Sequence, residues 1–183
     1  MNQTVHRLIH GDARDLSFLK DESIHLVVTS PPYWNLKRYN ENPDQLGHIG
    51  NYEIFLAELD KVWRHVFRVL VPGGRLVCVV GDVCVARRDF RRHLVFPLHA
   101  DISVLCRRIG FILMQRKPGG YRKPTDVQRQ KSMIEKRNFS KWFQQIWNLP
   151  GASLKYHPVP YPLELAARYL KAESADLFTN TEF

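Results

Sequence analysis

Short apolar runs that alternate with a long amphipathic stretch constrain the fold of this sequence more than any other feature. The runs at residues 5–9, 24–29 and 76–80 are mainly apolar, with few interruptions, which is typical of strands buried on both faces. Between the last two runs, apolar side chains recur at helical spacing over residues 52–70, and Asn51 is a candidate N-cap. The pattern predicts a strand, a helix and a strand in succession.

The alternation continues through the middle of the chain. Pro72-Gly73-Gly74 is expected to end the first helix and turn the chain. A second helix is predicted over residues 98–109, closed by Gly110, and a short strand over residues 111–114. Strands and helices in this order predict an α/β fold with a mostly parallel sheet.

Ligands of such sheets bind beyond the carboxyl ends of the strands, so the predicted strand ends are candidate sites. Each of the three candidate segments combines small and polar residues where a predicted strand has just ended. Taken singly, a Gly-Asp pair is also what an ordinary turn contains. The segments are Gly11-Asp12, Ser30 to Tyr33, and Gly81-Asp82.

Composition narrows the class of protein. The 183 residues suit one domain, and the formal net charge of +9 favours a polyanionic partner such as nucleic acid, although a merely basic surface gives the same charge. No apolar run approaches the roughly 20 residues of a membrane span, and residues 1–7 lack the apolar stretch of a secretory signal. We therefore expect a soluble cytoplasmic protein with no membrane partner. The three cysteines form no Cys-x-x-Cys pair and the histidines are scattered, so no metal site is predicted.

Basic residues concentrate in two segments. Residues 107–137 hold ten basic residues against two acidic ones, and they predict an exposed basic loop followed by a short helix near residues 127–135. A last helix is predicted over residues 162–170. The second basic cluster, after the third strand, contains Arg87, Arg88, Arg91 and Arg92. Both segments are candidate phosphate contacts, although a solvated charged face has the same composition.

The segment Thr29-Ser30-Pro31-Pro32-Tyr33-Trp34 carries the strongest chemical signal. Its two prolines stiffen the backbone and remove two N–H donors, which leaves carbonyl groups there to accept hydrogen bonds. The Ser30 hydroxyl adds an acceptor, and the two aromatic side chains add flat faces. These groups suit the binding of a flat heterocycle whose amino group is polarised and aligned with a methyl donor. The alternative is a proline-rich turn with an exposed aromatic side chain.

Ser30-Pro31-Pro32-Tyr33 after an apolar strand resembles the catalytic motif of DNA methyltransferases that modify amino groups, in the class where this motif precedes the cofactor loop. Further blocks resemble the same family in the same order. The resemblance implies a Rossmann-like fold dependent on S-adenosylmethionine. The further blocks are Gly11-Asp12-Ala13, Pro72-Gly73-Gly74-Arg75-Leu76, Val80-Gly81-Asp82, Phe96-Pro97-Leu98-His99-Ala100 with Gly110-Phe111, and His157-Pro158-Val159-Pro160-Tyr161-Pro162.

The resemblance also implies catalytic roles, carried by Ser30, Pro31, Pro32 and Tyr33. In this family the target base is flipped out of the duplex, because its amino group cannot be reached inside the stack. The Ser30 hydroxyl and the Pro31 carbonyl are expected to hold that amino group, and Tyr33 is expected to stack on the base. Ser at the first motif position favours cytosine N4 over adenine N6, and both targets stay open.

Other residues are assigned to the cofactor and to DNA by the same resemblance. Asp12 is expected to accept hydrogen bonds from the adenosine part of S-adenosylmethionine, with Asp82 as a second candidate. His157 and Pro158 are expected near its methionine end. The partner is expected to be double-stranded DNA, contacted by Trp34, Lys37, Arg116, Lys117, Arg122 and Lys123.

Two departures from the family pattern set further expectations. The family's cofactor loop, Asp-Pro-Phe-x-Gly-Ser-Gly-Thr, would follow the His157 block, but no Gly-x-Gly occurs in the sequence. The pocket for S-adenosylmethionine is therefore expected to be incomplete and the fold truncated. In addition, Gly110-Phe111 runs almost directly into residues 114–120, where relatives carry a further segment.

These observations predict a single methyltransferase domain over residues 1–183. Its expected parts are listed by range: a catalytic α/β part at 1–115, a basic DNA-contacting segment at 116–150, the His-Pro block and a helix at 151–174, and an unrelated tail at 175–183. Exposed apolar edges of a truncated sheet predict a homodimer or a tendency to aggregate, and a second polypeptide that carries the cofactor loop is another expected partner. Three functions stay open: a split or degenerate DNA methyltransferase, a catalytically silent DNA-binding protein with this fold, and a methyltransferase for RNA or another amine.

Overall fold

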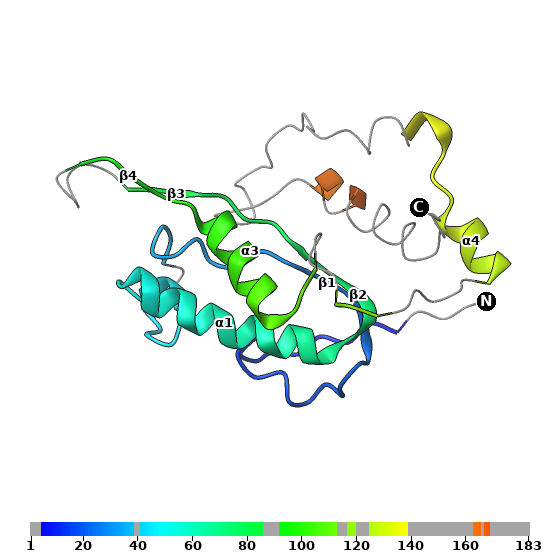
Figure 1. Cartoon of the computed structure of the whole chain (residues 1–183), viewed down its shortest axis with the longest axis horizontal. Helices are drawn as coiled ribbons and strands as arrows, with labels where there is room; N and C mark the ends of the chain where they lie inside the picture. The colour runs from blue at the N-terminus through cyan, green and yellow to red at the C-terminus, as the bar shows by residue number, and fades with distance from the viewer. Residues whose placement is uncertain are drawn as a thin grey trace. The chain divides into compact units, whose positions relative to one another are not determined.

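The computed structural model describes residues 5–38, 41–85, 92–112, 117–119, 125–138, 163–165 and 167–168 (Figure 1). They belong to two compact units, Met1–Pro118 and Gly119–Phe183. The first unit contains the strands, two long helices and a short 3-10 helix, η1 (Leu46–His48). The second contains α4 (Asp126–Ser132).

A parallel pair of strands forms the sheet of the first unit. β1 (Ile24–Thr29) and β2 (Leu70–Cys78) pair with Val27 opposite Leu76. The helix α1 (Tyr52–Val69) connects them, because parallel neighbours need a crossover connection. The predicted α/β fold with parallel strands is confirmed.

The helix α1 begins and packs as the sequence predicts. The side-chain oxygen of Asn51 accepts a hydrogen bond from the Ile54 N–H (3.0 Å), which satisfies one of the donors that the first turn leaves open. Its apolar side chains, buried at helical spacing, fix the helix in place, because intrinsic propensity alone stabilises a helix only weakly. The buried residues are Phe55, Leu59, Val62, Trp63, Val66 and Val69.

The start of β2 differs from the prediction. Pro72-Gly73-Gly74 does not form a separate turn but lies inside β2, which begins directly after α1 ends. The pairing register shifts opposite these residues, between Ile24 and Leu26, so β2 bulges there. The bulged backbone bonds to Lys117 instead: the Gly73 N–H donates to the Lys117 carbonyl (2.9 Å), and the Lys117 N–H donates to the Gly74 carbonyl (3.0 Å).

The second predicted helix is confirmed as α3 (Leu98–Ile109). Gly110 ends it with φ of 125°, and its N–H donates to the carbonyls of Cys106 and Arg107. A Cβ atom added to Gly110 would lie 3.2 Å from Cζ of Phe67. Both the backbone conformation and the neighbouring ring therefore favour glycine at this position.

A hairpin that the sequence analysis did not predict lies between β2 and α3. β3 (Val83–Val85) and β4 (Leu94–Phe96) pair antiparallel and extend beyond the helices of the first unit (Figure 1). Val83 is buried on one face of the hairpin, whereas Cys84 and Val95 are exposed on the other. Each strand has only three residues, so the alternation is too short to be recognised in the sequence.

Two predicted strands are not seen as predicted. Residues 5–9, which the structure describes, form no strand, and Leu8 is fully exposed. An apolar run becomes a strand only when a neighbour pairs with it, and none of the described strands pairs with this one. In the segment 111–114, Phe111 is buried and Ile112 makes a single β-bridge, whereas residues 113–114 lie outside the described part.

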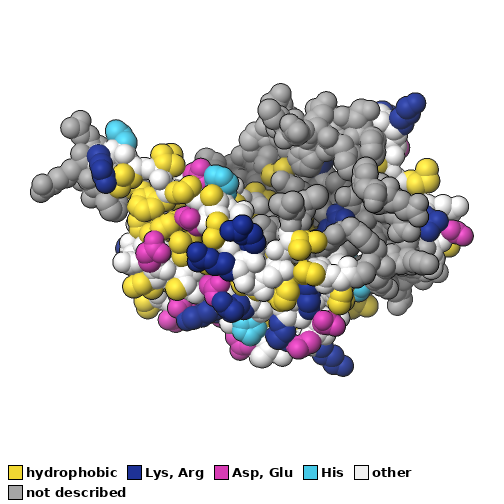
Figure 2. Space-filling model, in the orientation of Figure 1, with side chains coloured by type: hydrophobic (Ala, Val, Ile, Leu, Met, Phe, Trp, Pro, Cys, Tyr) yellow, Lys and Arg dark blue, Asp and Glu magenta, His cyan; other side chains and the backbone are white. Residues whose placement is uncertain are grey.

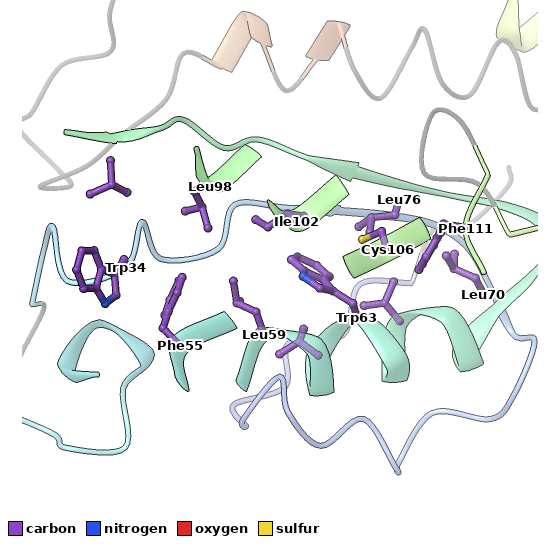
Figure 3. Close-up of a cluster of buried hydrophobic side chains, with 13 residues drawn as sticks. Trp34, Phe55, Leu59, Trp63, Leu70, Leu76, Leu98, Ile102, Cys106 and Phe111 are labelled. Atoms are coloured by element: carbon purple, nitrogen blue, oxygen red, sulfur yellow. The ribbon is translucent and has the colours of Figure 1, made fainter. Parts of the chain in front are cut away.

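The core of the first unit lies between α1, α3 and the strands (Figure 3). Trp63 of α1, Ile102 and Cys106 of α3 and Leu76 of β2 are almost fully buried there. Trp34 closes the same cluster at one end, beside Phe55 in Figure 3. The core therefore reaches directly to the segment that follows β1.

The second unit supplies shorter elements. α4 begins with a capping box, in which Thr125 and Gln128 exchange side-chain and backbone hydrogen bonds (3.2 and 2.9 Å), and this confirms a short helix close to residues 127–135. Of the predicted helix 162–170, residues 163–165 and 167–168 are helical and the others lie outside the described part. Among all the described helices, none combines the length and the apolar character needed to cross a membrane.

Candidate active site

The proline corner, defined here as Ser30 to Tyr33, directly follows β1. Ser30 is exposed, Pro31 is buried and Tyr33 is half-buried, so the corner is anchored at its first proline and open on either side of it. Among the described residues, no hydrogen bond reaches the Ser30 hydroxyl or the Pro31 carbonyl. Both groups therefore keep acceptor capacity that a ligand can use.

Tyr33 lies against the chain that follows β2. Its hydroxyl donates to the Val79 carbonyl at 3.4 Å, and a Cβ atom added to Gly81 would lie 3.6 Å from Tyr33 Cε2. The structure thus brings together two of the three segments that the sequence analysis selected, because both follow the carboxyl ends of parallel neighbours.

The role predicted for Trp34 is corrected by its position. Its side chain is 2% exposed, and its indole packs on the rings of Tyr52 (5.3 Å between centroids) and Phe96 (4.7 Å). A side chain enclosed in this way cannot stack on a base of bound nucleic acid. Trp34 is therefore a core residue next to the corner, which the sequence pattern could not distinguish from an exposed aromatic.

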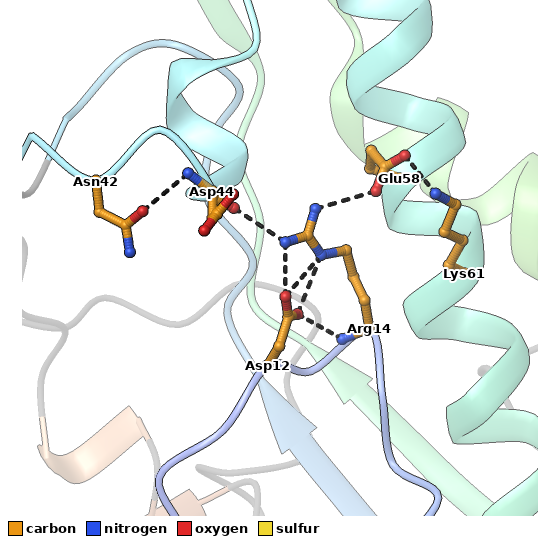
Figure 4. Close-up of polar contacts among 6 residues, drawn as sticks. All are labelled: Asp12, Arg14, Asn42, Asp44, Glu58 and Lys61. Atoms are coloured by element: carbon orange, nitrogen blue, oxygen red, sulfur yellow. Dashed lines mark hydrogen bonds and ion pairs between the residues drawn. The ribbon is translucent and has the colours of Figure 1, made fainter.

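Asp12 lies in a cluster of polar side chains that Arg14 organises (Figure 4). The Arg14 guanidinium donates to both Asp12 carboxylate oxygens (2.6 to 3.1 Å), and the Arg14 backbone N–H donates to Asp12 Oδ1 (2.8 Å). The guanidinium also reaches Glu58 Oε2 (3.1 Å) and the Asp44 carbonyl (3.1 Å), and Lys61 completes the cluster through Glu58 (2.5 Å).

Charge in this cluster keeps its carboxylates ionised. The hydrogen bonds from Arg14 lower the pKa of Asp12, and the bonds from Lys61 and then Arg14 lower the pKa of Glu58. The Asp12 side chain is still 50% exposed, so its anion is accessible to a ligand. A ligand at Asp12 must share the carboxylate with Arg14, a partner that the sequence analysis missed although the two residues are only two positions apart.

Asp82 is also paired. Its Oδ1 lies 2.5 Å from Nδ1 of His99 in the first turn of α3, and this contact lowers the pKa of Asp82. Close by in the chain, the Tyr52 hydroxyl donates to Asp101 Oδ2 (2.7 Å), and burial followed by this bond raises the pKa of Tyr52. His99 is a site residue that the sequence analysis did not assign, although it lies inside the block that resembles the family.

The residues predicted to contact DNA fall into three groups. Lys37 is exposed, as a phosphate contact requires. Lys117 is corrected: its ammonium group donates to Glu22 Oε1 and to the Leu70 carbonyl (both 3.0 Å) and lies 5.1 Å from the centre of the Phe67 ring, so internal partners occupy it. Those outside the described residues are Arg116, Arg122 and Lys123, together with the cofactor candidates His157 and Pro158.

Basic residues on α1 are matched by acidic neighbours. Lys61 pairs with Glu58, Arg64 with Asp60 (2.6 Å) and Arg68 with Asp21. In Figure 2, basic and acidic side chains are accordingly interspersed over the helical face of the first unit. The excess positive charge of the chain is therefore not concentrated on α1, which leaves other surfaces to meet a polyanion.

The part of the chain that the structure describes contains no group of side chains arranged as metal ligands. No three His, Cys, Asp or Glu side chains gather there in an arrangement that could hold an ion. His6 and His10 are four residues apart, but residues 5–10 are not helical, so this spacing does not place them on one face.

Comparison with known proteins gives a consistent family. Residues 24–119, more than half of the chain, match the protein family described as DNA methylase. This range begins with β1 and includes the proline corner, Asp82 and His99. The features that define the candidate site therefore lie within the matched range, except for Asp12 and Arg14.

Individual relatives point the same way. The chain is 52% identical to TTHA0409, a proposed DNA modification methylase of Thermus thermophilus whose crystal structure contains S-adenosyl-L-methionine, over 92% of this chain and 74% of that one, with a TM-score of 0.77. Two Type II methyltransferases are each 27% identical over 233 residues: M.MjaI of Methanocaldococcus jannaschii (92% of this chain, 76% of the relative) and M.MthZI of Methanothermobacter thermautotrophicus (94% and 64%).

The length of these alignments is informative. The matches to M.MjaI and M.MthZI each extend over 233 positions, whereas this chain has 183 residues. Both relatives therefore carry residues inside the matched region that this chain lacks. This agrees with the expected shortening after Gly110-Phe111, without locating it. The family match and the identity to TTHA0409 together show that the chain belongs to the DNA methylase family.

Proposed function

We propose that this protein transfers a methyl group from S-adenosylmethionine to the exocyclic amino group of cytosine (N4) or adenine (N6) in double-stranded DNA. The observation that carries the proposal is the proline corner. It combines an exposed Ser30 hydroxyl, the Pro31 carbonyl and a half-buried Tyr33 ring beyond the carboxyl end of β1.

The corner suits an amino-bearing base that has left the duplex. The Ser30 hydroxyl and the Pro31 carbonyl accept the two amino hydrogens, and the Tyr33 ring stacks on the base. Accepting these hydrogens increases electron density on the nitrogen, whose lone pair attacks the methyl carbon while the carbon–sulfur bond breaks. The methylated nitrogen then loses one proton to solvent.

The described residues fit part of the cofactor. When bound, S-adenosylmethionine supplies the electrophilic methyl group, and in this proposal Asp12 accepts hydrogen bonds from its adenosine part. The carboxylate is ionised and half exposed, which suits this role, although Arg14 already holds it. No Gly-x-Gly turn occurs in the sequence for the methionine part, so a second polypeptide that supplies this turn is part of the proposal.

The choice of base rests on one residue. Serine at position 30, where the family often has aspartate, favours cytosine N4. Methylation of a plasmid library followed by nucleoside mass spectrometry distinguishes N4-methylcytosine from N6-methyladenine and tests this choice directly.

A transfer assay tests the function itself. Purified protein, alone and with a lysate of the source cells, is incubated with duplex DNA and S-adenosylmethionine labelled in the methyl group. We expect transfer that Tyr33→Ala abolishes and that Ser30→Ala reduces by about 10²-fold, since one polar contact in a reaction site has about that effect. Retained transfer in Tyr33→Ala contradicts the assigned site.

A second function is a silent DNA-binding protein with the same fold. The four hydrogen bonds from Arg14 to Asp12 favour it, because they satisfy the carboxylate without a ligand. Calorimetry with S-adenosylmethionine separates the two functions. Dissociation constants in the low micromolar range support the enzyme, whereas absent binding, alone and with a second polypeptide, supports the silent protein. Light scattering during the same experiments tests the expected homodimer.

A further inference from the structure

We propose that Trp34 is a positioning residue, which holds Tyr33 in the orientation needed to stack on an extrahelical base. The proposal rests on the proposed function, because Tyr33 has a base to stack on only if the corner binds one. It adds a role for a residue that itself touches neither the base nor the cofactor.

Tyr33 is weakly restrained by its own side chain. Its hydroxyl bond to the Val79 carbonyl, at 3.4 Å, is near the upper limit for a hydrogen bond. Gly81, beside the ring, has no side chain to pack against it, whereas the other side of the half-buried Tyr33 packs against the core cluster that contains Trp34. The orientation of the ring therefore depends on that core and on its backbone, which continues directly into Trp34.

Trp34 is held firmly by aromatic packing. Its indole meets Tyr52 edge-on (5.3 Å, 72° between planes) and Phe96 at a tilt (4.7 Å, 58°). Tyr52 is itself fixed, because it packs on Phe96 (4.7 Å) and its hydroxyl donates to Asp101. Side chains of α1 and β4 thus contact Trp34 directly, and α3 supports this packing through the bond from Tyr52 to Asp101.

The backbone at Trp34 is strained. Its φ of 48° lies in the left-handed region, which is unfavourable for a residue with a Cβ and persists only where the surroundings enforce it. The turn is closed by the Leu36 N–H, which donates to the Tyr33 carbonyl (3.1 Å). In addition, Gly47 of η1 packs closely against the chain that follows the turn, because a Cβ atom added to Gly47 would lie only 2.8 Å from the Lys37 carbonyl oxygen.

The indole N–H is not what holds Trp34 in place. Its Nε1 is buried, and within the described part of the chain it has no hydrogen-bond partner. Shape and aromatic packing therefore account for the anchoring, and phenylalanine should largely preserve it. Trp63 provides a matched control, because it is equally buried in the same core on α1 and its Nε1 likewise lacks a partner among the described residues.

Photo-crosslinking tests the proposal on the full chain without requiring methyl transfer. The probe is a pool of duplexes that each carry one bulged 5-iodocytosine, which keeps the exocyclic amino group, and the adduct is located by peptide mass spectrometry. We expect an adduct on Tyr33 in the wild-type protein and in Trp63→Leu. In Trp34→Leu the yield should fall at least about tenfold, since a small misplacement is enough to lose productive geometry. Trp34→Phe should stay within about threefold of wild type.

Affinity for the same DNA, measured by fluorescence anisotropy, should change less than about threefold in all variants, because the phosphate contacts are unaltered. If Trp34→Leu does not fold, Phe96→Leu loosens the same packing from β4 and should lower the adduct yield in the same direction. An adduct yield in the folded variant equal to that of Trp63→Leu overturns the role of Trp34 alone. A wild-type protein that binds the DNA but forms no adduct on Tyr33 overturns the proposed function instead.

Discussion

Asp82 Oδ1 and His99 Nδ1 lie 2.5 Å apart, so the chain that leaves β2 is tied to the first turn of α3. The hairpin β3–β4 lies between these two residues in the sequence. The contact therefore closes the base of the hairpin, one residue beyond the Gly81 position that faces Tyr33.

This pair predicts a dependence of stability on pH. Because His99 lowers the pKa of Asp82, the folded state binds fewer protons than the unfolded state between the folded pKa and the unfolded pKa of about 3.9. The stabilisation is present above that unfolded value and is lost as the pH falls through the folded one. We expect Asp82→Asn to lower the free energy of unfolding at about pH 6 and to lower it less near pH 2.5, where the carboxyl group of the unfolded state is protonated. Urea unfolding at both pH values measures this, with the exposed Glu41→Gln as a control; equal losses at both values contradict it.

Gly110 predicts a large effect of a small substitution. Gly110→Ala forces a φ of 125° on a residue with a Cβ and presses that atom toward Phe67. We expect the free energy of unfolding to fall by about 2 kcal/mol. Gly50→Ala is the matched control, because an added Cβ there meets nothing within 4 Å. Thermal unfolding of both variants measures this, and a similar loss of stability in Gly110→Ala and Gly50→Ala contradicts the prediction.

The two lysines predict opposite effects on DNA binding. Lys37 is exposed, so Lys37→Gln should reduce the slope of log affinity against log salt by about 0.9, the value for one lost phosphate contact. Lys117→Gln should leave that slope unchanged and lower stability instead, because its ammonium group already serves Glu22 and the Leu70 carbonyl. Anisotropy titrations over a range of salt concentrations measure the slope, and a reduced slope in Lys117→Gln disproves its internal role.

Cysteine reactivity provides a further prediction. Burial raises the pKa of Cys78 to about 12 and, with a smaller contribution from neighbouring charges, that of Cys106 to about 12, whereas Cys84 is exposed. Since the thiolate is the reactive form, a thiol reagent at about pH 8 should label Cys84 first and the other two only after unfolding. Peptide mass spectrometry identifies the labelled residue, and rapid native labelling of Cys106 contradicts this core.

Periodicity made the long elements of the first unit predictable. The stripe that includes Phe55 and Leu59 requires a helix with one buried face, and Asn51 and Gly110 mark helix ends through local chemistry alone. Such features depend only on residues that are close in the sequence, so they can be predicted without knowing the fold. The position of the proline corner beyond a strand end was predictable for the same reason.

What the sequence left open depends on distant partners. The apolar run at residues 5–9 has the composition of a strand but none of the described strands pairs with it, and the direction in which Trp34 points is decided by Tyr52 and Phe96. Likewise, Lys117 is basic in the sequence, but only the fold places Glu22 beside it. A charge or an aromatic ring indicates what a residue can do, and its neighbours determine which of these it does.

The parallel pairing of β1 with β2 also bears on how fast this chain acquires its structure. Thr29 pairs with Cys78 only after the intervening loop, η1 and α1 have been brought into place. The chain therefore loses the conformational entropy of closing this long segment before strand pairing provides any stabilisation. High contact order of this kind slows folding and lengthens the time for which the apolar face of α1 is uncovered. Folding therefore competes with aggregation until the strands and α3 have covered the apolar face of α1.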